Sequence, residues 1–168
     1  AGKDVTLIAR GKHLEAIRKN GLTIQKLWDE SRETLPVKAC TAEEYKEIPD
    51  VILVCVKGYS MDETVPTIKK IAGKETVVIP ILNIYGTGGR LQKKLPELTV
   101  TDGCIYVSAN IMEPGVILQH GKILRVVFGA RKPEEETENI IHVLYLRRIG
   151  RNRPIKLRPR RKDRAAAK

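Results

Sequence analysis

The sequence lacks most of the patterns that would assign it to a class at once. Its three cysteines, Cys40, Cys55 and Cys104, show no C-x-x-C spacing, which argues against a disulfide framework or a zinc knuckle and favours buried thiols. The acidic residues and histidines show no metal-ligand spacing, so we expect no metal site. No apolar run approaches the roughly 20 residues of a membrane helix, and no signal-peptide pattern opens the chain. We therefore expect a soluble, cytoplasmic protein.

Positive charge is unevenly distributed along the 168 residues. The net charge is +11, but residues 147–168 hold eleven lysines and arginines against the single acid Asp163 and so carry +10 of it. That stretch contains two prolines and no apolar period, which predicts a basic, disordered tail. Residues 1–146 carry an ordinary charge and predict one globular domain with its own core.

A strand followed by a helix recurs three times in the first hundred residues. The clearest strand is the continuous Val/Ile/Leu run at 50–58, which is typical of a strand buried on both faces of a parallel sheet. The pattern predicts a Rossmann-like, doubly wound α/β fold with a mostly parallel sheet. The expected units combine strands at 4–10, 50–58 and 76–82 with helices at 12–22, 61–74 and 90–98.

Other stretches depart from this alternation. Residues 103–129 contain strand-like runs separated by Glu113-Pro114-Gly115 and by His120-Gly121, which predicts antiparallel hairpins at the sheet edge. Residues 133–148 begin with a proline and acids and end with arginines, which predicts a final helix. Residues 22–40 read as short strands or extended loop, whose pairings stay open.

Three polar residues stand where the apolar strands end: Arg10, Lys57 and Asn83. In a doubly wound fold, ligands bind at the carboxyl ends of the strands. Arg10 suits a 2′-phosphate and so favours NADP over NAD, although a surface loop can simply carry an arginine. Lys57 precedes Gly58, which permits a close backbone approach. Asn83 suits a carboxamide or a hydroxyl, and capping of the next helix explains it equally well.

Four stretches of the sequence occur in a specific order and spacing: "VTLIARGKHLEAIRKNGL", "DVILVCVKGY", "TVVIPILNIYGTG" and "SANIMEPGVILQHG". Together they resemble the N-terminal domain of ketopantoate reductase, also called 2-dehydropantoate 2-reductase, over residues 1–129. The resemblance implies a Rossmann domain joined to a helical C-terminal domain. It also implies an oxidoreductase that reduces a small 2-keto acid, ketopantoate, to pantoate with NADPH, in the pathway to pantothenate and coenzyme A.

The resemblance assigns roles to four residues. Arg10 is similar to the family's arginine for the 2′-phosphate of NADP, and Lys57 to the lysine that faces cofactor and substrate. Asn83 matches the asparagine at the nicotinamide and substrate end, and Ala109 matches the position whose backbone meets the cofactor. The resemblance thus implies four cofactor-binding residues, of which Lys57 and Asn83 also bind substrate.

The sequence departs from the family at three places. The family's glycine-rich turn for the pyrophosphate precedes the equivalent of Asp4 and is not in this sequence. Ile84 stands where the family has a glycine after the asparagine, and nothing after Gly129 matches the helical domain that carries the general acid. We therefore expect a partial NADP-binding domain over 1–146, incomplete at both ends, in which the catalytic residue is unknown.

A second interpretation assigns function to the tail. Its phosphate-binding side chains would make the chain a nucleic-acid or ribosome-associated protein acting through residues 147–168. The tail has no aromatic residue for base stacking, and the body has no basic stripe. The sequence therefore favours a small-molecule 2-keto acid as partner over a nucleic acid or a membrane, and it leaves the oligomeric state open.

The chain by itself is expected to reduce ketopantoate slowly or not at all, because the pyrophosphate-binding turn and the general acid both fall outside the resemblance. The loss of NADPH absorbance in the presence of ketopantoate measures this rate. Turnover of about 1 per second or more, which is ordinary for enzymes, would contradict the expectation of a partial domain.

Overall fold

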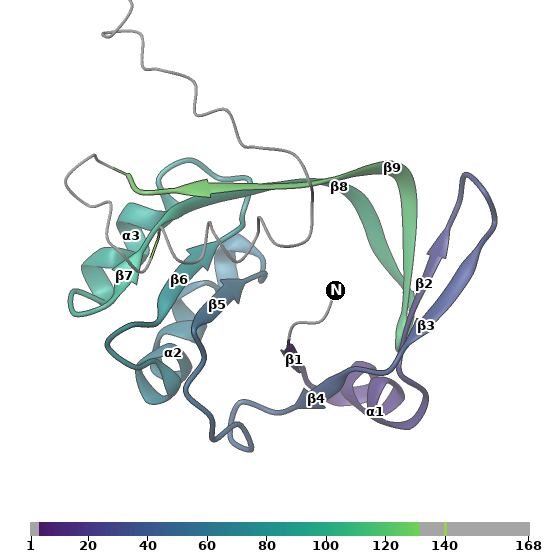
Figure 1. Cartoon of the computed structure of the whole chain (residues 1–168), viewed down its shortest axis with the longest axis horizontal. Coiled ribbons are helices and arrows are strands. Elements are labelled where there is room, and N and C mark those ends of the chain that lie inside the picture. Colours follow the sequence, from purple (N-terminus) through teal and green to yellow (C-terminus); the bar gives the residue numbers. More distant parts are fainter. Residues whose placement is uncertain (1–3, 132–139, 141–168) are drawn as a thin grey trace, which may run out of the picture.

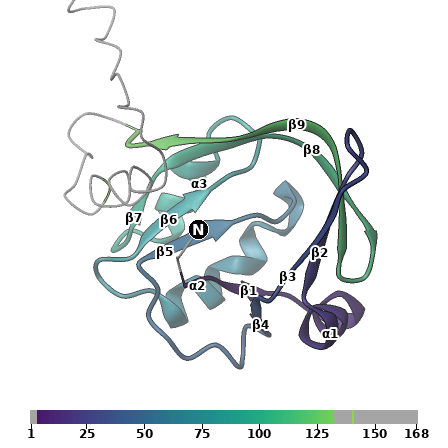
Figure 2. The ribbon, with the colours of Figure 1, turned by 45° about the vertical axis from the view of Figure 1, so that its right-hand side comes forward.

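The computed structural model describes residues 4–131 and 140 and shows an α/β fold (Figure 1). Its elements are, in order, β1 (Thr6–Ile8), α1 (Gly11–Asn20), β2 (Leu22–Lys26), β3 (Arg32–Leu35), β4 (Lys38–Cys40), β5 (Val51–Val54), the 3₁₀ turns η1 (Gly58–Ser60) and η2 (Asp62–Thr64), α2 (Val65–Ile71), β6 (Val77–Pro80), α3 (Thr87–Lys94), β7 (Thr99–Val100), β8 (Asp102–Glu113) and β9 (Val116–Gly129). Strands β5, β6 and β7 form one half with α2 and α3, and β1 to β4 form the other half with α1. The β8–β9 hairpin reaches across both halves (Figure 2).

Strand β6 is the centre of the larger half, because all four of its residues are buried. It pairs in parallel with β5 on one side and with β7 on the other. Its side chains point alternately to two apolar layers, as the two-residue period of a strand requires. Val78 packs with residues of α2 and α3, whereas Val77 and Ile79 pack with residues of the hairpin. The predicted Rossmann-like α/β class is confirmed, although the parallel pairs are divided among three sheets: β1 with β4, β2 with β9, and β5 and β7 with β6.

The smaller half contains the first predicted strand and helix, and both are confirmed. Strand β1 pairs in parallel with β4, and α1 ends at Asn20. Gly21 follows with a φ of +81°, and a Cβ on it would lie 2.7 Å from the carbonyl oxygen of Leu35. Only glycine fits such a backbone. Residues 22–40, which the sequence left unpaired, contain the antiparallel pair β2 and β3 together with β4.

One long hairpin replaces the several hairpins expected between residues 103 and 129. Strands β8 and β9 pair antiparallel along their length, and the predicted turn at Pro114-Gly115 is confirmed. The turn predicted at His120-Gly121 is wrong, because these residues lie inside β9 next to a shift in register between Val107 and Ala109. Parallel pairing with β2 keeps β9 extended up to this point, and no local sequence signal contains that pairing.

Helix α1 and strand β2 hold the turn of the hairpin. The Nδ1 atom of His13 accepts a hydrogen bond from the backbone N–H of Gly115 at 3.0 Å. The backbone N–H of Thr23 donates to the carbonyl of the same Gly115 at 2.8 Å. Leu14 and Ile17 are buried on α1. The far end of the hairpin is therefore fixed by contacts that are distant in sequence.

Strand β5 is shorter and more exposed than the sequence predicts for residues 50–58. Leu53 shares a face with Val51, which packs against the hairpin layer, but Leu53 itself is 53% exposed. Among the described strands, β5 pairs only with β6 and β1 only with β4, so each keeps one open edge. The prediction of buried thiols is also wrong. Cys55 directly follows this open strand and is exposed, while the other two cysteines are partly buried.

Two predictions fall on residues that the structure does not describe. The final helix at 133–148 is one of them, except for Ile140, which is buried with Val77 and Ile79. The basic tail at 147–168 is the other. Within the described ranges, no helix is long and apolar enough to cross a membrane.

Gly103→Ala is expected to destabilise the fold by about 2 kcal/mol, because overpacking a close contact costs that much. A Cβ on Gly103 would lie 2.6 Å from the carbonyl oxygen of Pro80 and 3.1 Å from Cγ2 of Ile79. Gly121→Ala, on the same hairpin, is the matched control, since nothing lies within 4 Å of its Cβ position. It should change stability by less than about 0.5 kcal/mol. Urea unfolding followed by circular dichroism measures both variants, and equal effects would contradict the close crossing of β8 over β6.

Candidate functional site

The turns that follow β5 and β6 meet at one edge of the parallel sheet. The two strands run in parallel, so their carboxyl ends lie side by side. Beyond the strands, Gly58 lies against the side chain of Ile84, and any Cβ on Gly58 would collide with the Cδ1 atom of Ile84. The structure therefore brings together the turns that carry Lys57 and Asn83.

Lys57 is exposed at the start of η1, after β5. Its backbone is extended, and its carbonyl accepts a hydrogen bond from the N–H of Ser60 at 2.9 Å. Within the described residues, its ammonium group has no ion-pair or hydrogen-bond partner. A free cation at the end of a parallel strand is available to an anionic ligand.

Asn83 follows β6, and its side-chain amide is already engaged. Its Nδ2 donates to the carbonyl of Ile105 at 2.8 Å, and its Oδ1 accepts the N–H of the same residue at 3.1 Å. This pair of hydrogen bonds to the backbone of Ile105 holds β8 at the end of β6. Asn83 does not cap the next helix, because α3 begins after Gly86 and has no side-chain hydrogen bond at its N-cap.

The other two expected residues lie apart from this pair of turns. Arg10 is exposed between β1 and α1, in the smaller half, and its side chain has no ion-pair or hydrogen-bond partner among the described residues. Ala109 is exposed on β8, opposite Gln119 and next to the shift in register. The described structure gives no direct contact that joins either residue to Lys57 or Asn83.

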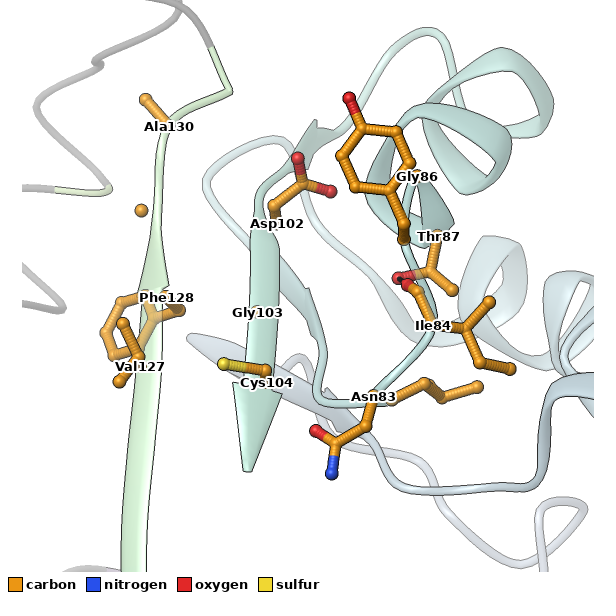
Figure 3. A pocket seen from close by; sticks show the side chains of 13 residues that line it. Asn83, Ile84, Gly86, Thr87, Asp102, Gly103, Cys104, Val127, Phe128 and Ala130 are labelled. Atoms are coloured by element: carbon orange, nitrogen blue, oxygen red, sulfur yellow. Dashed lines mark hydrogen bonds between the residues drawn. The ribbon is translucent and has the colours of Figure 1, made fainter. Parts of the chain in front are cut away.

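A hollow of about 480 Å³ opens between the turn after β6 and the start of the hairpin (Figure 3). Its walls come from residues 82–87, 102–104 and 127–130. Figure 3 shows Asp102 directed from β8 toward Gly86 and Thr87. The Oδ1 atom of Asp102 accepts the backbone N–H of Gly88 at 3.1 Å, in the first turn of α3.

Sequence reasoning missed Asp102 as a site residue. Asp102 follows β7, which contains only two residues. A search for polar residues after long apolar strands therefore does not find it. Its position in the hollow depends on the pairing of β7 with β6 and on the packing of α3. Neither contact is visible in the local sequence.

Asp62 ties the turn after β5 to α3. Its carboxylate accepts a hydrogen bond from the Nζ of Lys94 at 2.7 Å and lies 3.9 Å from the guanidinium of Arg90. The hydrogen bond from Lys94, with the charge of Lys94 and Arg90, holds the pKa of Asp62 below its usual range. This clamp keeps the segment after Lys57 in place against the helix that follows the hollow.

Parallel strands, crossover helices and polar turns at the carboxyl edge define a Rossmann-like α/β fold, a class in which ligands bind at that edge. The chain also matches the family described as "Ketopantoate reductase PanE/ApbA" over residues 1–133. The chain belongs to the ketopantoate reductase family, whose members are pyridine-nucleotide-dependent oxidoreductases.

Individual relatives agree with this assignment. A 2-dehydropantoate 2-reductase of Pyrococcus horikoshii is 34% identical over 128 residues, which are 75% of this chain and 40% of the relative. The crystal structure of 2-dehydropantoate 2-reductase from Porphyromonas gingivalis W83 is 33% identical with a TM-score of 0.73, over 85% of this chain and 50% of that one. A D-mandelate dehydrogenase solved with NADH and anilino(oxo)acetate is 19% identical with a TM-score of 0.66, over 87% and 53%, and shares the fold. The chain thus spans about half the length of these proteins or less.

Asp62→Asn should flatten the acid side of the stability profile. A carboxylate whose pKa is lowered by folding stabilises the fold above its unfolded pKa of about 4, and this contribution is lost as the pH falls through the folded pKa. Stability should therefore fall less in the variant than in the unchanged chain between about pH 5 and pH 3. Glu63→Gln is the control, because the neighbouring Glu63 has no ion pair within the described residues. Urea midpoints across this range give the comparison, and parallel profiles for all three proteins would show that the clamp contributes nothing.

Proposed function

We propose that this chain is the nucleotide-binding part of an NADPH-dependent reductase that converts ketopantoate, a 2-keto acid, to pantoate on the way to pantothenate and coenzyme A. Family membership and the names of the relatives support the reaction. The observation that carries the proposal is the contact between the turns of Lys57 and Asn83 at the carboxyl edge of a parallel sheet. In this proposal the reaction takes place in the cytoplasm.

The available side chains fit a phosphorylated dinucleotide. Arg10 and Lys57 are exposed cations without ionic partners in the described structure, and each follows a strand. Arg10 takes the 2′-phosphate of NADP, and Lys57 faces the cofactor and the carboxylate of the keto acid. The backbone at Ala109 meets the cofactor. Asn83 holds β8 in position and thereby shapes the nicotinamide and substrate end.

The bound cofactor supplies a hydride for the ketone carbon. The chain's own contribution is to bind and orient the reactants, since the proton donor for the developing alkoxide is unassigned among the described residues. Residues 1–146 form the nucleotide-binding domain in this proposal, and residues 147–168 form a separate basic tail. The nucleic-acid alternative rests on that tail alone, which lies outside the described residues.

Arg10→Ala is expected to weaken NADPH binding by about tenfold or more, because a charge-assisted hydrogen bond to phosphate contributes on the order of 1.5–3 kcal/mol. NADH lacks the 2′-phosphate, so its affinity should stay within about twofold. Lys12→Ala is the matched control, since Lys12 is also exposed and lies two residues further along α1. Fluorescence titration of the reduced nucleotides measures all three proteins. Equal affinities of the unchanged chain for NADPH and NADH would rule out the role of Arg10. The comparison of the two nucleotides is needed because the D-mandelate dehydrogenase that shares this fold was solved with NADH.

A further inference from the structure

A second hollow, of about 680 Å³, lies between α3 and β7, which are side by side in Figure 1. Its walls come from α3, from the segment that joins α3 to β7, from β7 itself and from Arg131 after β9. We call it the α3–β7 hollow. Among the described residues, only Gly86 also lines the hollow that contains Asp102. The four residues assigned to the cofactor and the keto acid lie outside its walls, so the proposed function does not use it.

The side chain of Gln92 occupies the polar backbone groups of one wall. Its Nε2 donates to the carbonyls of Leu95 at 2.8 Å and Leu98 at 2.9 Å, and its Oε1 accepts the N–H of Val100 at 3.3 Å. The same Oε1 accepts a hydrogen bond from Nη2 of Arg131 at 3.4 Å. Within the described part of the chain β7 pairs only with β6, and Gln92 takes the groups beside β7 that an added strand would need. A ligand in the hollow is therefore recognised by the other side chains of its walls and not by strand pairing.

Every charged side chain in the described walls is a cation, namely Arg90, Lys93 and Arg131. Arg90 and Lys93 are three residues apart on α3 and so share one face of the helix. Lys93 is exposed and has no ion-pair or hydrogen-bond partner within the described residues. The guanidinium of Arg90 lies 3.9 Å from the carboxylate of Asp62, which takes its hydrogen bond from Lys94. The hollow therefore attracts an anion.

The rest of the walls suits an organic group. Pro96 is exposed, and Leu98 and Thr99 are partly buried. The volume of about 680 Å³ falls within the range of roughly 300–1,000 Å³ that is typical of small-molecule sites. Glu97, the acid of this segment, is exposed and is not one of the residues that line the hollow. The hollow thus combines a cationic side with an apolar side.

We propose that the α3–β7 hollow binds a small phosphate monoester, whose phosphate pairs with Arg90 and Lys93 and whose organic group lies against Pro96 and Leu98. A phosphate monoester carries about −1.5 to −2 charges near pH 7 and has three strong acceptor oxygens, which two cations on one helix face can share. A carboxylate has one charge and two oxygens, so it is the weaker ligand. The proposal does not depend on the function proposed above, because it uses none of the residues of that site.

Phenyl phosphate, benzoate and inorganic phosphate are the probes, because the second lacks the phosphate and the third lacks the ring. Titration of the ¹⁵N-labelled 168-residue chain, followed by NMR, should shift the backbone amides of Gly89 and Thr99 with phenyl phosphate. Benzoate and inorganic phosphate should each bind at least about fivefold more weakly. Lys93→Glu should weaken the binding of phenyl phosphate at least about tenfold, because it replaces an attraction with a repulsion. Lys74→Glu is the matched control, an exposed change of the same charge outside the hollow, and should leave the affinity within about twofold.

The three probes test the proposal on the unchanged chain, whether or not the variants fold. It is overturned if phenyl phosphate does not bind, if either of the other probes binds as tightly, or if the shifts map away from the hollow. Equal losses of affinity in the two charge reversals would also overturn it. Phenyl phosphate should stay bound when NADPH is added. Its displacement would show that the phosphate occupies the cofactor site, which contradicts a separate site between α3 and β7.

Discussion

Strand β8 crosses β6 at Gly103, where the carbonyl of Pro80 lies too close for any side chain. This crossing places the hairpin on the face of β6 that the described helices leave open, so Val77 and Ile79 are buried beneath it. Burial of one such side chain contributes on the order of 1.5–3 kcal/mol. The two apolar layers of β6, and therefore the edge where the turns of the site meet, depend on this one close approach.

The hairpin also explains why the two halves hold together although their parallel strands do not pair with each other. Its near end is fixed to β6 by the amide of Asn83, and its far end is fixed to α1 and β2 through Gly115. The strands β1 and β5 each keep an open edge in the described structure, and Ile8 and Leu53 stay 44% and 53% exposed. Backbone pairing along the hairpin therefore connects the half that contains β1 to β4 with the half that contains β5 to β7.

Local sequence patterns predicted the elements whose physics is local. Helix α1 and its Gly21 cap, the buried run of β6 and the turn at Pro114-Gly115 all follow from apolar periodicity and turn residues. The failures share one cause, which is pairing between distant segments. His120 lies in a strand because β9 pairs with β2. Leu53 is exposed because the apolar layer under the hairpin includes Val51 of β5 but not Leu53.

The candidate site follows the same division. The position of Lys57 was predictable, because any lysine after a buried parallel strand reaches the carboxyl edge. The use of the Asn83 amide and the presence of Asp102 were not, since both depend on where β8 lies. Because both polar atoms of the Asn83 amide bind the backbone of Ile105, this side chain fixes the position of β8. Ile84 lies against Gly58, the residue next to Lys57, and it also lines the hollow that contains Asp102, so the two turns of the site meet at one apolar side chain.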